Sequence, residues 1–389
     1  MRIKAKDILY KLIFIYPLLN IIVCYIFHGD NMNLFCLIYC SILVGIYCNL
    51  ERRISKWFFL GLFFLMAISI LEFLREENIS NFVIYIMFIM TNIIMYMYSE
   101  KKFNIIDFAN SIYENYRLYM IGQMGFVGIL ILYVLKNGLT YGWNTMVLQG
   151  PYNYPHTLAY LALFLLIADA FLYLEYNMRL ALIFMIIQMG IILLTAVRTT
   201  LLIVAVVAWY FLVNLAGKKQ IKKILFIVLL TCIVLSVAYR QGIFNALIEK
   251  TSLALANSTL TNGRGKIALT SLKALENGNL AKNLILGIGI SNLMKWNQVY
   301  LLSAIHAHND FVDAIVCYGV VALIIYLCNL YCFSQKKVVW ILATIGMLAF
   351  SNGLFEYIDC MPLLIYARLL FEARKKEVSP KNKMIIEKG

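Results

Sequence analysis

The strongest constraint on this chain is a series of apolar runs, each long enough to cross a lipid bilayer as a helix. Such a helix needs about 16–24 mainly apolar residues, because the hydrocarbon layer is about 30 Å thick. The runs lie near 8–28, 33–50, 56–74, 80–98, 117–136, 156–175, 178–196, 199–216, 221–239, 308–331, 337–352 and 357–372. Backbone groups inside lipid must satisfy their own hydrogen bonds, which a helix does. The sequence therefore predicts an all-α polytopic membrane protein with about 12 transmembrane helices.

Composition agrees with a membrane protein and leaves no room for a separate soluble domain. Hydrophobic residues make up 62% and charged residues 14% of the chain, with a mean hydropathy of +0.80. Soluble domains contain about 25% charged residues. We expect 1–389 to be a single multi-pass membrane domain, with 240–307 a large extracytoplasmic helical loop inserted between the ninth and tenth spans. The first run has no small-residue cleavage site after it, so we expect a retained helix.

The net charge of +14 reflects membrane topology and not nucleic-acid binding. Basic residues cluster in alternate connections, whereas the short connections near Asp30, Glu76 and Asp359 are acidic or neutral. The basic clusters are Arg52, Arg53 and Lys56; Lys101 and Lys102; Lys218, Lys219, Lys222 and Lys223; Lys336 and Lys337; and Arg374, Lys375 and Lys376. Basic connections stay in the cytoplasm. Both termini are therefore expected there, and no nucleic-acid partner is expected.

The nine cysteines do not indicate a disulfide framework or a metal site. Most of them fall inside the apolar runs, and none lies in the long outer loop. A free cysteine is a good small hydrophobe in such a position.

Two long connections lie on the outer face in this topology. The first, about 137–155, is rich in Gly, Pro and aromatic residues and is expected to be an ordered interfacial loop. In the second, Asn262 can cap a helix that begins near Arg264. Further on, Gly287 and Gly289 interrupt an apolar stretch, which predicts a tight turn or a close approach of two backbones.

Arg198 separates two apolar runs with almost no connecting loop. The predicted topology puts it at the outer face, against the usual distribution of basic residues, and an arginine near hydrocarbon costs up to about 3 kcal/mol. It is either an arginine that snorkels from a helix end or an anion-binding residue. A guanidinium forms forked hydrogen bonds with phosphate and stays charged at every relevant pH.

Arg264 stands at the expected start of a helix, in Asn262-Gly263-Arg264-Gly265. The free N–H groups and the positive dipole end of a helix N-terminus attract anions, and an arginine adds donors to them. The alternative is an isolated loop arginine. Since Arg198 is predicted on the same face, an anion site is favoured.

His306 and His308 are two of the four histidines and lie where the long loop meets an apolar run. An imidazole with a pKa near 6.5 can take a proton from a hydroxyl near neutral pH. We favour His308 as this base, with Asn309 able to orient it and with His306, Asp310 and Asp313 nearby. A structural or capping histidine is the alternative. A metal site is disfavoured, because the nearby acids lack a spacing such as His-Glu-x-x-His.

Three further polar residues are predicted at the outer ends of apolar runs. His156 follows Pro155 and could line the same cavity as the residues above. Glu356 and Asp359 are expected in a solvated loop, with a carboxylate base as the alternative.

Arg198, Arg264 and His308 come from separate parts of the chain and are all predicted on one membrane face. Two cations and a base suit a phosphate-bearing leaving group and a hydroxyl nucleophile. The cytoplasmic side offers no domain for a nucleotide-sugar enzyme, and the chain has no Asp-x-Asp metal motif. The expected donor is a lipid-linked phosphate or pyrophosphate presented outside.

These residues resemble the bacterial O-antigen ligase and polysaccharide-polymerase superfamily. Its signature is a His-Asn pair separated by nine residues from a Gly, after a large extracytoplasmic loop; His308-Asn309 and Gly319 fit this spacing. Ala322 departs from a second, glycine-like position. The motifs cover about 150–330, and the other resembling positions are Arg198, Arg264, Gly287, Gly289 and the segment after Pro155.

The resemblance implies a GT-C-type fold that transfers an undecaprenyl-pyrophosphate-linked glycan at the outer face of the bacterial cytoplasmic membrane, without metal or cofactor. It implies that Arg198 and Arg264 bind the pyrophosphate and that His308 activates the acceptor hydroxyl. A single displacement would then invert the anomeric carbon. The implied partners are the lipid-linked oligosaccharide and membrane lipid, with a chain-length regulator and a flippase as further expected partners.

We expect a repeat-unit polymerase, with a ligase that transfers the glycan to lipid A core as the alternative. A transporter or flippase for the same lipid-linked sugar is the alternative from another class. A transporter would place ionisable residues at the bilayer midplane and broken helices in paired repeats. The candidate residues cluster instead at one predicted face.

Overall fold

The computed structural model describes residues 2–27, 32–50, 56–76, 79–98, 105–142, 145–215, 263–334 and 357–373, with single positions between 229 and 252. Packing divides the chain into two compact units, each assembled from separate stretches. Unit 1 contains Met1–Phe35, Phe103–Leu253 and Asp359–Gly389, and unit 2 contains Cys36–Lys102 and Ala254–Ile358. The single membrane domain and the inserted loop 240–307 stay predictions.

The described residues confirm an all-α membrane protein. Except for 337–352 and most of 221–239, which lie outside the described residues, every predicted run coincides with helix. Four described helices are long and apolar enough to cross a membrane: Asp7–Phe27, Asn115–Asn137, Pro155–Leu174 and Asp310–Phe333. In the other apolar helices the apolar stretch among the described residues is shorter, 10–17 residues. The count of about 12 spans and the GT-C-type fold stay predictions.

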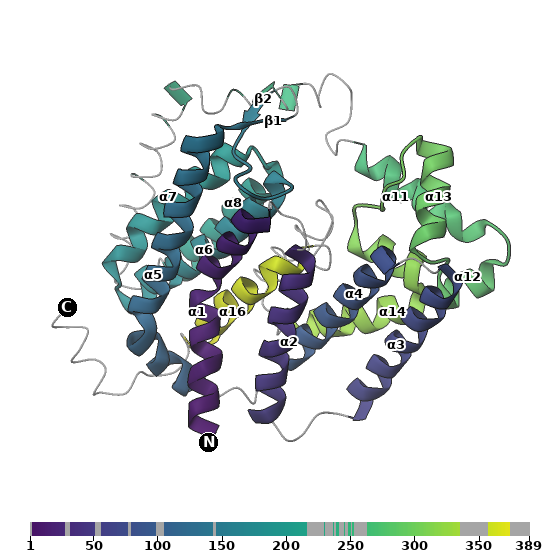
Figure 1. Ribbon diagram of the computed structural model, residues 1–389, viewed down its shortest axis with the longest axis horizontal. Coiled ribbons are helices and arrows are strands. Elements are labelled where there is room, and N and C mark those ends of the chain that lie inside the picture. Colours follow the sequence, from purple (N-terminus) through teal and green to yellow (C-terminus); the bar gives the residue numbers. More distant parts are fainter. Residues whose placement is uncertain are drawn as a thin grey trace. The chain divides into compact units, whose positions relative to one another are not determined.

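Unit 1 is built from long helices that lie side by side (Figure 1). They are α1 (Arg2–Phe27), α5 (Ile105–Asn137), α6 (Pro155–Tyr176), α7 (Arg179–Thr195), α8 (Arg198–Leu215) and α16 (Met361–Ala373), the last preceded by the short 3-10 helix η2 (Ile358–Cys360). The helix α2 (Met32–Leu50) begins in unit 1 and ends in unit 2. The pairs α1 with α5 and α6 with α7 make the most extensive contacts.

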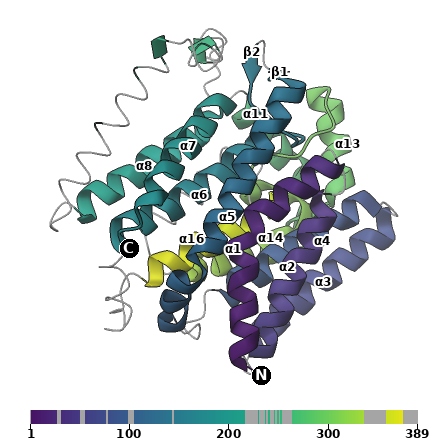
Figure 2. The ribbon, with the colours of Figure 1, turned by 60° about the vertical axis from the view of Figure 1, so that its left-hand side comes forward.

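Two-residue turns join α6, α7 and α8, which Figure 2 shows next to one another. Pro155 opens α6, where its missing N–H costs nothing. Asn177 closes α6 and Ala196 closes α7, both in the left-handed region, with φ of 57° and 52°. Because the helices reverse twice, α6 and α8 start at the same end of unit 1.

The described part of the loop between α5 and α6 contains a small β-hairpin, in a chain predicted to be all helical. The strands β1 (Thr140–Gly142) and β2 (Thr145–Val147) pair in antiparallel register. The Leu148 N–H, just after β2, donates to the Leu194 carbonyl at 2.8 Å. The hairpin is thereby fixed to the end of α7.

A buried polar network joins three apolar helices of unit 1. The Asp169 carboxylate of α6 is fully buried and accepts hydrogen bonds from Tyr119 (3.0 Å) and Gln123 (2.7 Å) of α5. Gln188 of α7 donates to the Gln123 side-chain oxygen at 2.9 Å. A polar group in hydrocarbon costs several kcal/mol unless it is hydrogen-bonded. These contacts therefore specify how α5, α6 and α7 face one another.

Glycines allow α5 to approach α1 closely. A Cβ atom on Gly122 would lie 2.9 Å from the Phe14 carbonyl oxygen, and one on Gly125 would collide with the Leu18 side chain. Without a hydrophobic driving force in lipid, small residues at a helix crossing permit the contacts that hold helices together.

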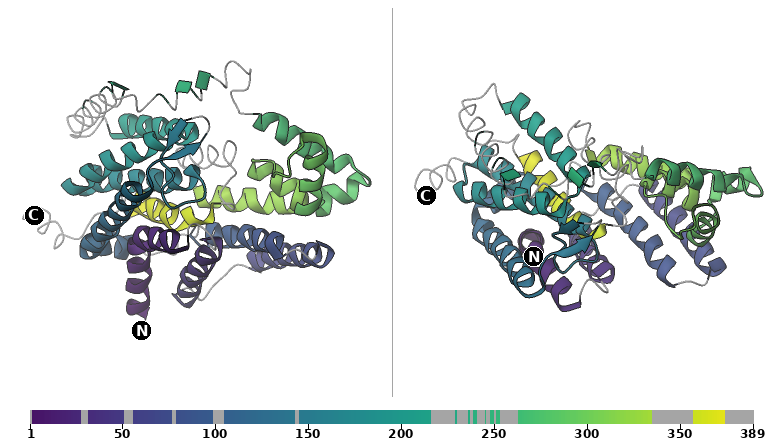
Figure 3. Two further views of the ribbon diagram at one scale, coloured as in Figure 1. Left: turned by 45° about the horizontal axis from the view of Figure 1, so that its top comes forward. Right: turned by 90° about the horizontal axis from the view of Figure 1, so that it is seen from above.

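Unit 2 combines apolar helices with the short helices of the long loop. The apolar helices are α3 (Lys56–Glu76), α4 (Ile79–Met97) and α14 (Asp310–Ser334), and the loop helices are α11 (Arg264–Lys273), the 3-10 turn η1 (Ala274–Glu276), α12 (Leu280–Leu286) and α13 (Ile290–Leu301). Figure 3 shows α11, α12 and α13 as short helices at one end of α14. The described part of the loop is helical, as predicted.

The predicted span 308–331 is not one straight helix, because α14 is broken at Gly319. This residue has φ 86° and ψ 172°, outside the helical region. Tyr326 donates a hydrogen bond to Asp310 at 2.6 Å, although a straight helix would separate these residues by about 24 Å. The two halves of α14 therefore fold against each other.

The break is filled by the glycine-containing segment of the long loop. A Cβ atom on Gly319 would collide with the Ile285 carbonyl, and one on Gly287 would lie 2.7 Å from the Tyr318 nitrogen. The Ile288 N–H donates to the Val316 carbonyl at 2.8 Å, which satisfies an acceptor that the break has released. The predicted close approach of two backbones is confirmed.

Replacing Gly319 with Ala should destabilise the protein by about 3 kcal/mol or more, because strain at positive φ adds to a collision with backbone. Gly278→Ala is the matched control: Gly278 has φ +89°, but no described atom lies within 4 Å of the place that a Cβ atom would occupy. The control should lose only about 1 kcal/mol. Thermal unfolding of both purified variants in one detergent measures the difference. Equal losses would contradict the backbone collision at Gly319.

Candidate functional site

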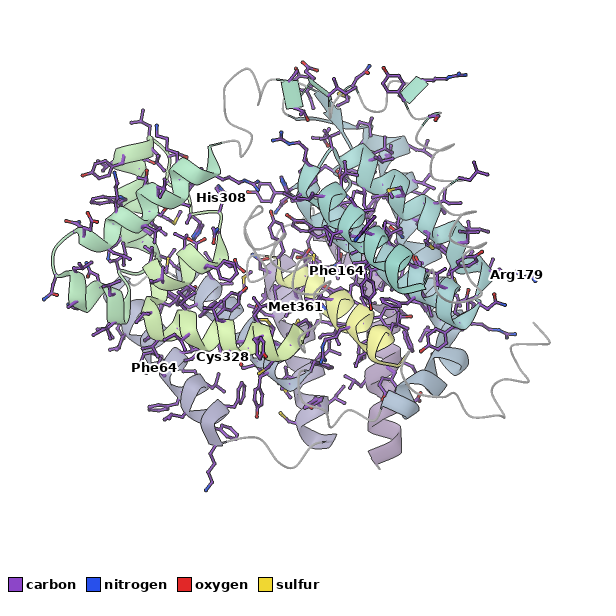
Figure 4. The ribbon with its side chains drawn as sticks, turned by 180° about the vertical axis from the view of Figure 1, so that it is seen from behind. Phe64, Phe164, Arg179, His308, Cys328 and Met361 are labelled. Carbon is purple, nitrogen blue, oxygen red and sulfur yellow. The ribbon has the colours of Figure 1, made fainter. Side chains whose placement is uncertain are left out.

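The candidate site of unit 2 lies in the segment between α13 and α14, where His308 is labelled in Figure 4. Asn297 of α13 donates to the Ile305 carbonyl at 2.7 Å. Asp313 of α14 accepts from the Ala307 N–H at 3.0 Å. The segment is therefore fixed from both neighbouring helices, immediately ahead of His308.

His308 is half-buried and has an unusual backbone conformation. Its φ of 54° lies in the left-handed region, which costs a residue other than glycine about 1–2 kcal/mol. Such strain persists where the surroundings fix it and is common at functional sites. Burial, the Arg264 guanidinium and His306 lower the pKa of His308 from 6.5 to about 4. At neutral pH its imidazole is uncharged and can accept a proton.

Arg264 is the first residue of α11, as predicted, and lies close enough to His308 to affect its charge. The predicted cap, Asn262, lies outside the described residues. Gly263, which has no side chain to cap the helix, occupies the N-cap position with φ 77°. A guanidinium beside the first N–H groups of a helix is an arrangement that attracts anions.

Asn309 caps α14 with its side-chain oxygen, and its expected role in orienting His308 stays a prediction. The oxygen accepts from the Phe311 N–H at 3.0 Å and the Val312 N–H at 3.3 Å. The first N–H groups of a helix have no partner within the helix, and an N-cap asparagine supplies one. The role of Asn309 is to fix the start of α14 directly after His308.

Asp310 and Asp313 are both buried but have different partners. Asp310 is fully buried and accepts from Tyr326 across the break in α14, so it supports the fold of the helix. Asp313 is 1% exposed and contacts the histidine segment through Ala307. Sequence reasoning placed both near His308 and could not distinguish them, because the difference depends on the break.

Arg198 and His156 belong to unit 1. Arg198 is half-buried and is the first residue of α8, directly after the buried turn residues Ala196 and Val197. His156 is half-buried in the first turn of α6, with its ring 6.3 Å from the Tyr160 ring. Since α6 and α8 start at the same end of the unit, both residues lie at that end. The prediction that they share a cavity with His308 stays a prediction.

Asp359 is not in a solvated loop, which corrects the sequence-based expectation. It is 5% exposed, and its backbone carbonyl accepts from the Tyr16 hydroxyl at 2.5 Å. Asn20 then links Tyr16 to the Tyr152 hydroxyl, through bonds of 3.0 and 2.8 Å. Asp359 is part of a buried connection within unit 1. Glu356 lies outside the described residues.

Sequence reasoning missed Asp169, although the signal was visible as a carboxylate inside the apolar run 156–175. A carboxylate within a candidate span is the kind of residue that a transporter would need. In unit 1 it bonds to Tyr119 and Gln123, so packing accounts for it.

Comparison with known proteins gives one match. Residues 180–327 match the family model described as O-antigen ligase. No curated protein and no solved structure matches the chain. The matched segment includes Arg198, Arg264 and His308, and also both glycines of the break, Gly287 and Gly319.

Proposed function

Since this chain belongs, through residues 180–327, to the O-antigen ligase and polysaccharide-polymerase superfamily, we propose that it is an oligosaccharide repeat-unit polymerase. It transfers an undecaprenyl-pyrophosphate-linked glycan to a sugar hydroxyl on the outer face of the cytoplasmic membrane. One observation carries the proposal: Arg264, at the start of α11, lies close to His308, which is half-buried and uncharged.

The chemistry follows from these two residues. The acceptor hydroxyl oxygen attacks the anomeric carbon of the donor sugar and gives its proton to the His308 imidazole. The bond between that carbon and the pyrophosphate oxygen breaks, and undecaprenyl pyrophosphate leaves with the electron pair. Arg264 stabilises the negative charge of the leaving group. A single displacement inverts the anomeric carbon, and no metal takes part in the proposed step.

Arg198 is the second proposed pyrophosphate-binding residue. Its support is the family resemblance and its place at the start of α8, where the first N–H groups of a long helix favour an anion. A guanidinium in that position binds phosphate oxygens in forked geometry.

Two observations favour the transporter alternative, but a third feature expected of a transporter is missing from the sequence. Asp169 is an ionisable group inside a candidate span, and α14 is a broken helix. Both features have structural partners, Tyr119 and Gln123 for Asp169 and the glycine segment for the break. A transporter would also carry them in paired repeats, which the sequence does not contain. The enzyme is therefore the better-supported function.

Single substitutions of Arg198, Arg264 or His308 by Ala in a gene-deletion strain should each reduce surface polymer by about 100-fold, because each removes a charge partner or the base of the reaction. Lys273→Ala is the matched control: it removes an exposed cation from the far end of α11 and should leave the polysaccharide ladder unchanged. Full-length polymer from all three variants, at normal protein level, would refute the catalytic role.

Deletion of the gene separates polymerase from ligase. Loss of a polymerase should leave surface glycan capped with a single repeat unit. Loss of a ligase should leave long glycan on its lipid carrier. The products are compared by gel electrophoresis of surface and lipid-linked fractions, with the complemented strain as the control.

The rate of glycan transfer should persist to a lower pH than expected for a histidine base with an ordinary pKa near 6.5. His308 must be uncharged to accept a proton, and its pKa in the free protein is lowered to about 4. The uncharged form, and with it kcat/KM, should therefore persist from pH 7 to about pH 5 and fall below that. Bound pyrophosphate offsets the charge of Arg264 and raises the pKa of His308, so kcat should fall at a higher pH than kcat/KM.

This pH dependence is measured with purified protein in detergent and a lipid-linked donor extracted from the deletion strain. Intrinsic tryptophan fluorescence at each pH controls for unfolding. If kcat/KM instead falls near pH 6.5, the surroundings of His308 do not lower its pKa as inferred from burial, Arg264 and His306.

A further inference from the structure

The carboxylate of Asp313 reaches back from α14 into the segment that carries both histidines. It is 1% exposed, and its Oδ1 atom accepts from the Ala307 N–H at 3.0 Å. Ala307 is itself fully buried and lies between His306 and His308. The peptide that joins the two histidines is therefore held at a fixed position relative to α14.

His306 lies within electrostatic range of both Asp313 and His308. The Oδ2 atom of Asp313 is buried, and no group among the described residues donates a hydrogen bond to it. A carboxylate in the first turn of a helix is favoured by the helix dipole. The Asp313 carboxylate also interacts with the Asn309 backbone, so it contacts the residues on both sides of His308.

This contact also explains how His308 stays in a strained conformation. The hydrogen bond from Ala307 to Asp313 fixes the residue before His308, and the cap made by Asn309 fixes the residue after it. With both neighbours fixed, the φ of 54° at His308 is imposed by the start of α14. Loss of the hydrogen bond between Ala307 and Asp313 would free the residue before His308.

We propose that Asp313 is the positioning residue of the site: it fixes the peptide between His306 and His308, which keeps His308 beside Arg264. This rests on the proposed transferase function only for its consequence on the rate. Asp310 is the natural contrast. It is equally buried in the first turn of the same helix, but its carboxylate accepts a hydrogen bond from Tyr326, across the break in α14.

Histidine-selective ¹³C labelling tests the positioning directly, because the chain has only four histidines. The imidazole signals of His28, His156, His306 and His308 are assigned with single His→Gln variants in detergent micelles. Asp313→Asn keeps an oxygen for the Ala307 N–H but removes the charge, so it should shift the signals of His306 and His308. Asp310→Asn should leave both in place, and neither variant should move His156.

Unchanged His306 and His308 signals in Asp313→Asn would overturn the proposal, and so would equal shifts in Asp310→Asn, which would mean a general effect on α14. Asp313→Ala removes both oxygen atoms and should shift the signals further. If the Ala variant fails to fold, Asp313→Asn and Asp313→Glu still decide the question.

Binding and turnover complete the test. Undecaprenyl pyrophosphate serves as the probe, and its binding is followed by tryptophan fluorescence. Asp313→Asn should bind it as the wild-type protein does, because the phosphate-binding residues are intact, while polymer formation falls about 10- to 100-fold through a misplaced base. Loss of probe binding together with activity would indicate a collapsed site and refute positioning. If the histidine signals shift but Arg264→Ala and His308→Ala still make polymer, the proposed function fails and the positioning stands.

Discussion

The close approach of two backbones at Gly287 and Gly319 is the contact on which unit 2 depends. It breaks α14, and the break gives Ile288 a carbonyl to bond with. The same break turns the first half of α14 so that Asp310 meets Tyr326. As a result, the N-terminus of α14, with His308 two residues before it, is held by the long loop. A side chain at either glycine would occupy the space of the opposing backbone.

Buried carboxylates are the second feature that organises this protein. Asp169, Asp310 and Asp313 lie within apolar helices, where an unsatisfied carboxylate would be costly. Each has a hydrogen-bond donor from another part of the chain: tyrosine and glutamine side chains, a tyrosine across the break, and a backbone N–H next to the histidines. Such contacts are directional, whereas contacts among leucine and isoleucine side chains are not. They therefore determine which helix faces meet in an environment without a hydrophobic driving force.

Sequence reasoning located the candidate residues but did not predict several of their contacts. His308 and Arg264 were identified from residue type and spacing, and the structure brings them close together in unit 2. Asn309 has a role that the sequence did not predict, because its side-chain oxygen caps α14. Asp359 was placed in solvent, yet it is buried. Both findings depend on the backbone direction at a helix start, and spacing along the sequence does not give that direction.

The sequence by itself determined that this chain is a helical membrane protein, because apolar runs of spanning length have no other way to satisfy their backbone in lipid. It also determined the positions of nearly all described helices and the likeness of one segment to O-antigen ligases. Only the tertiary structure decided that the run 308–331 is broken, that Asp313 accepts from Ala307 whereas Asp310 accepts from Tyr326, and that Asp169 joins three helices. Hydropathy measures how apolar a stretch is, and it does not depend on the backbone conformation, such as the positive φ of Gly319.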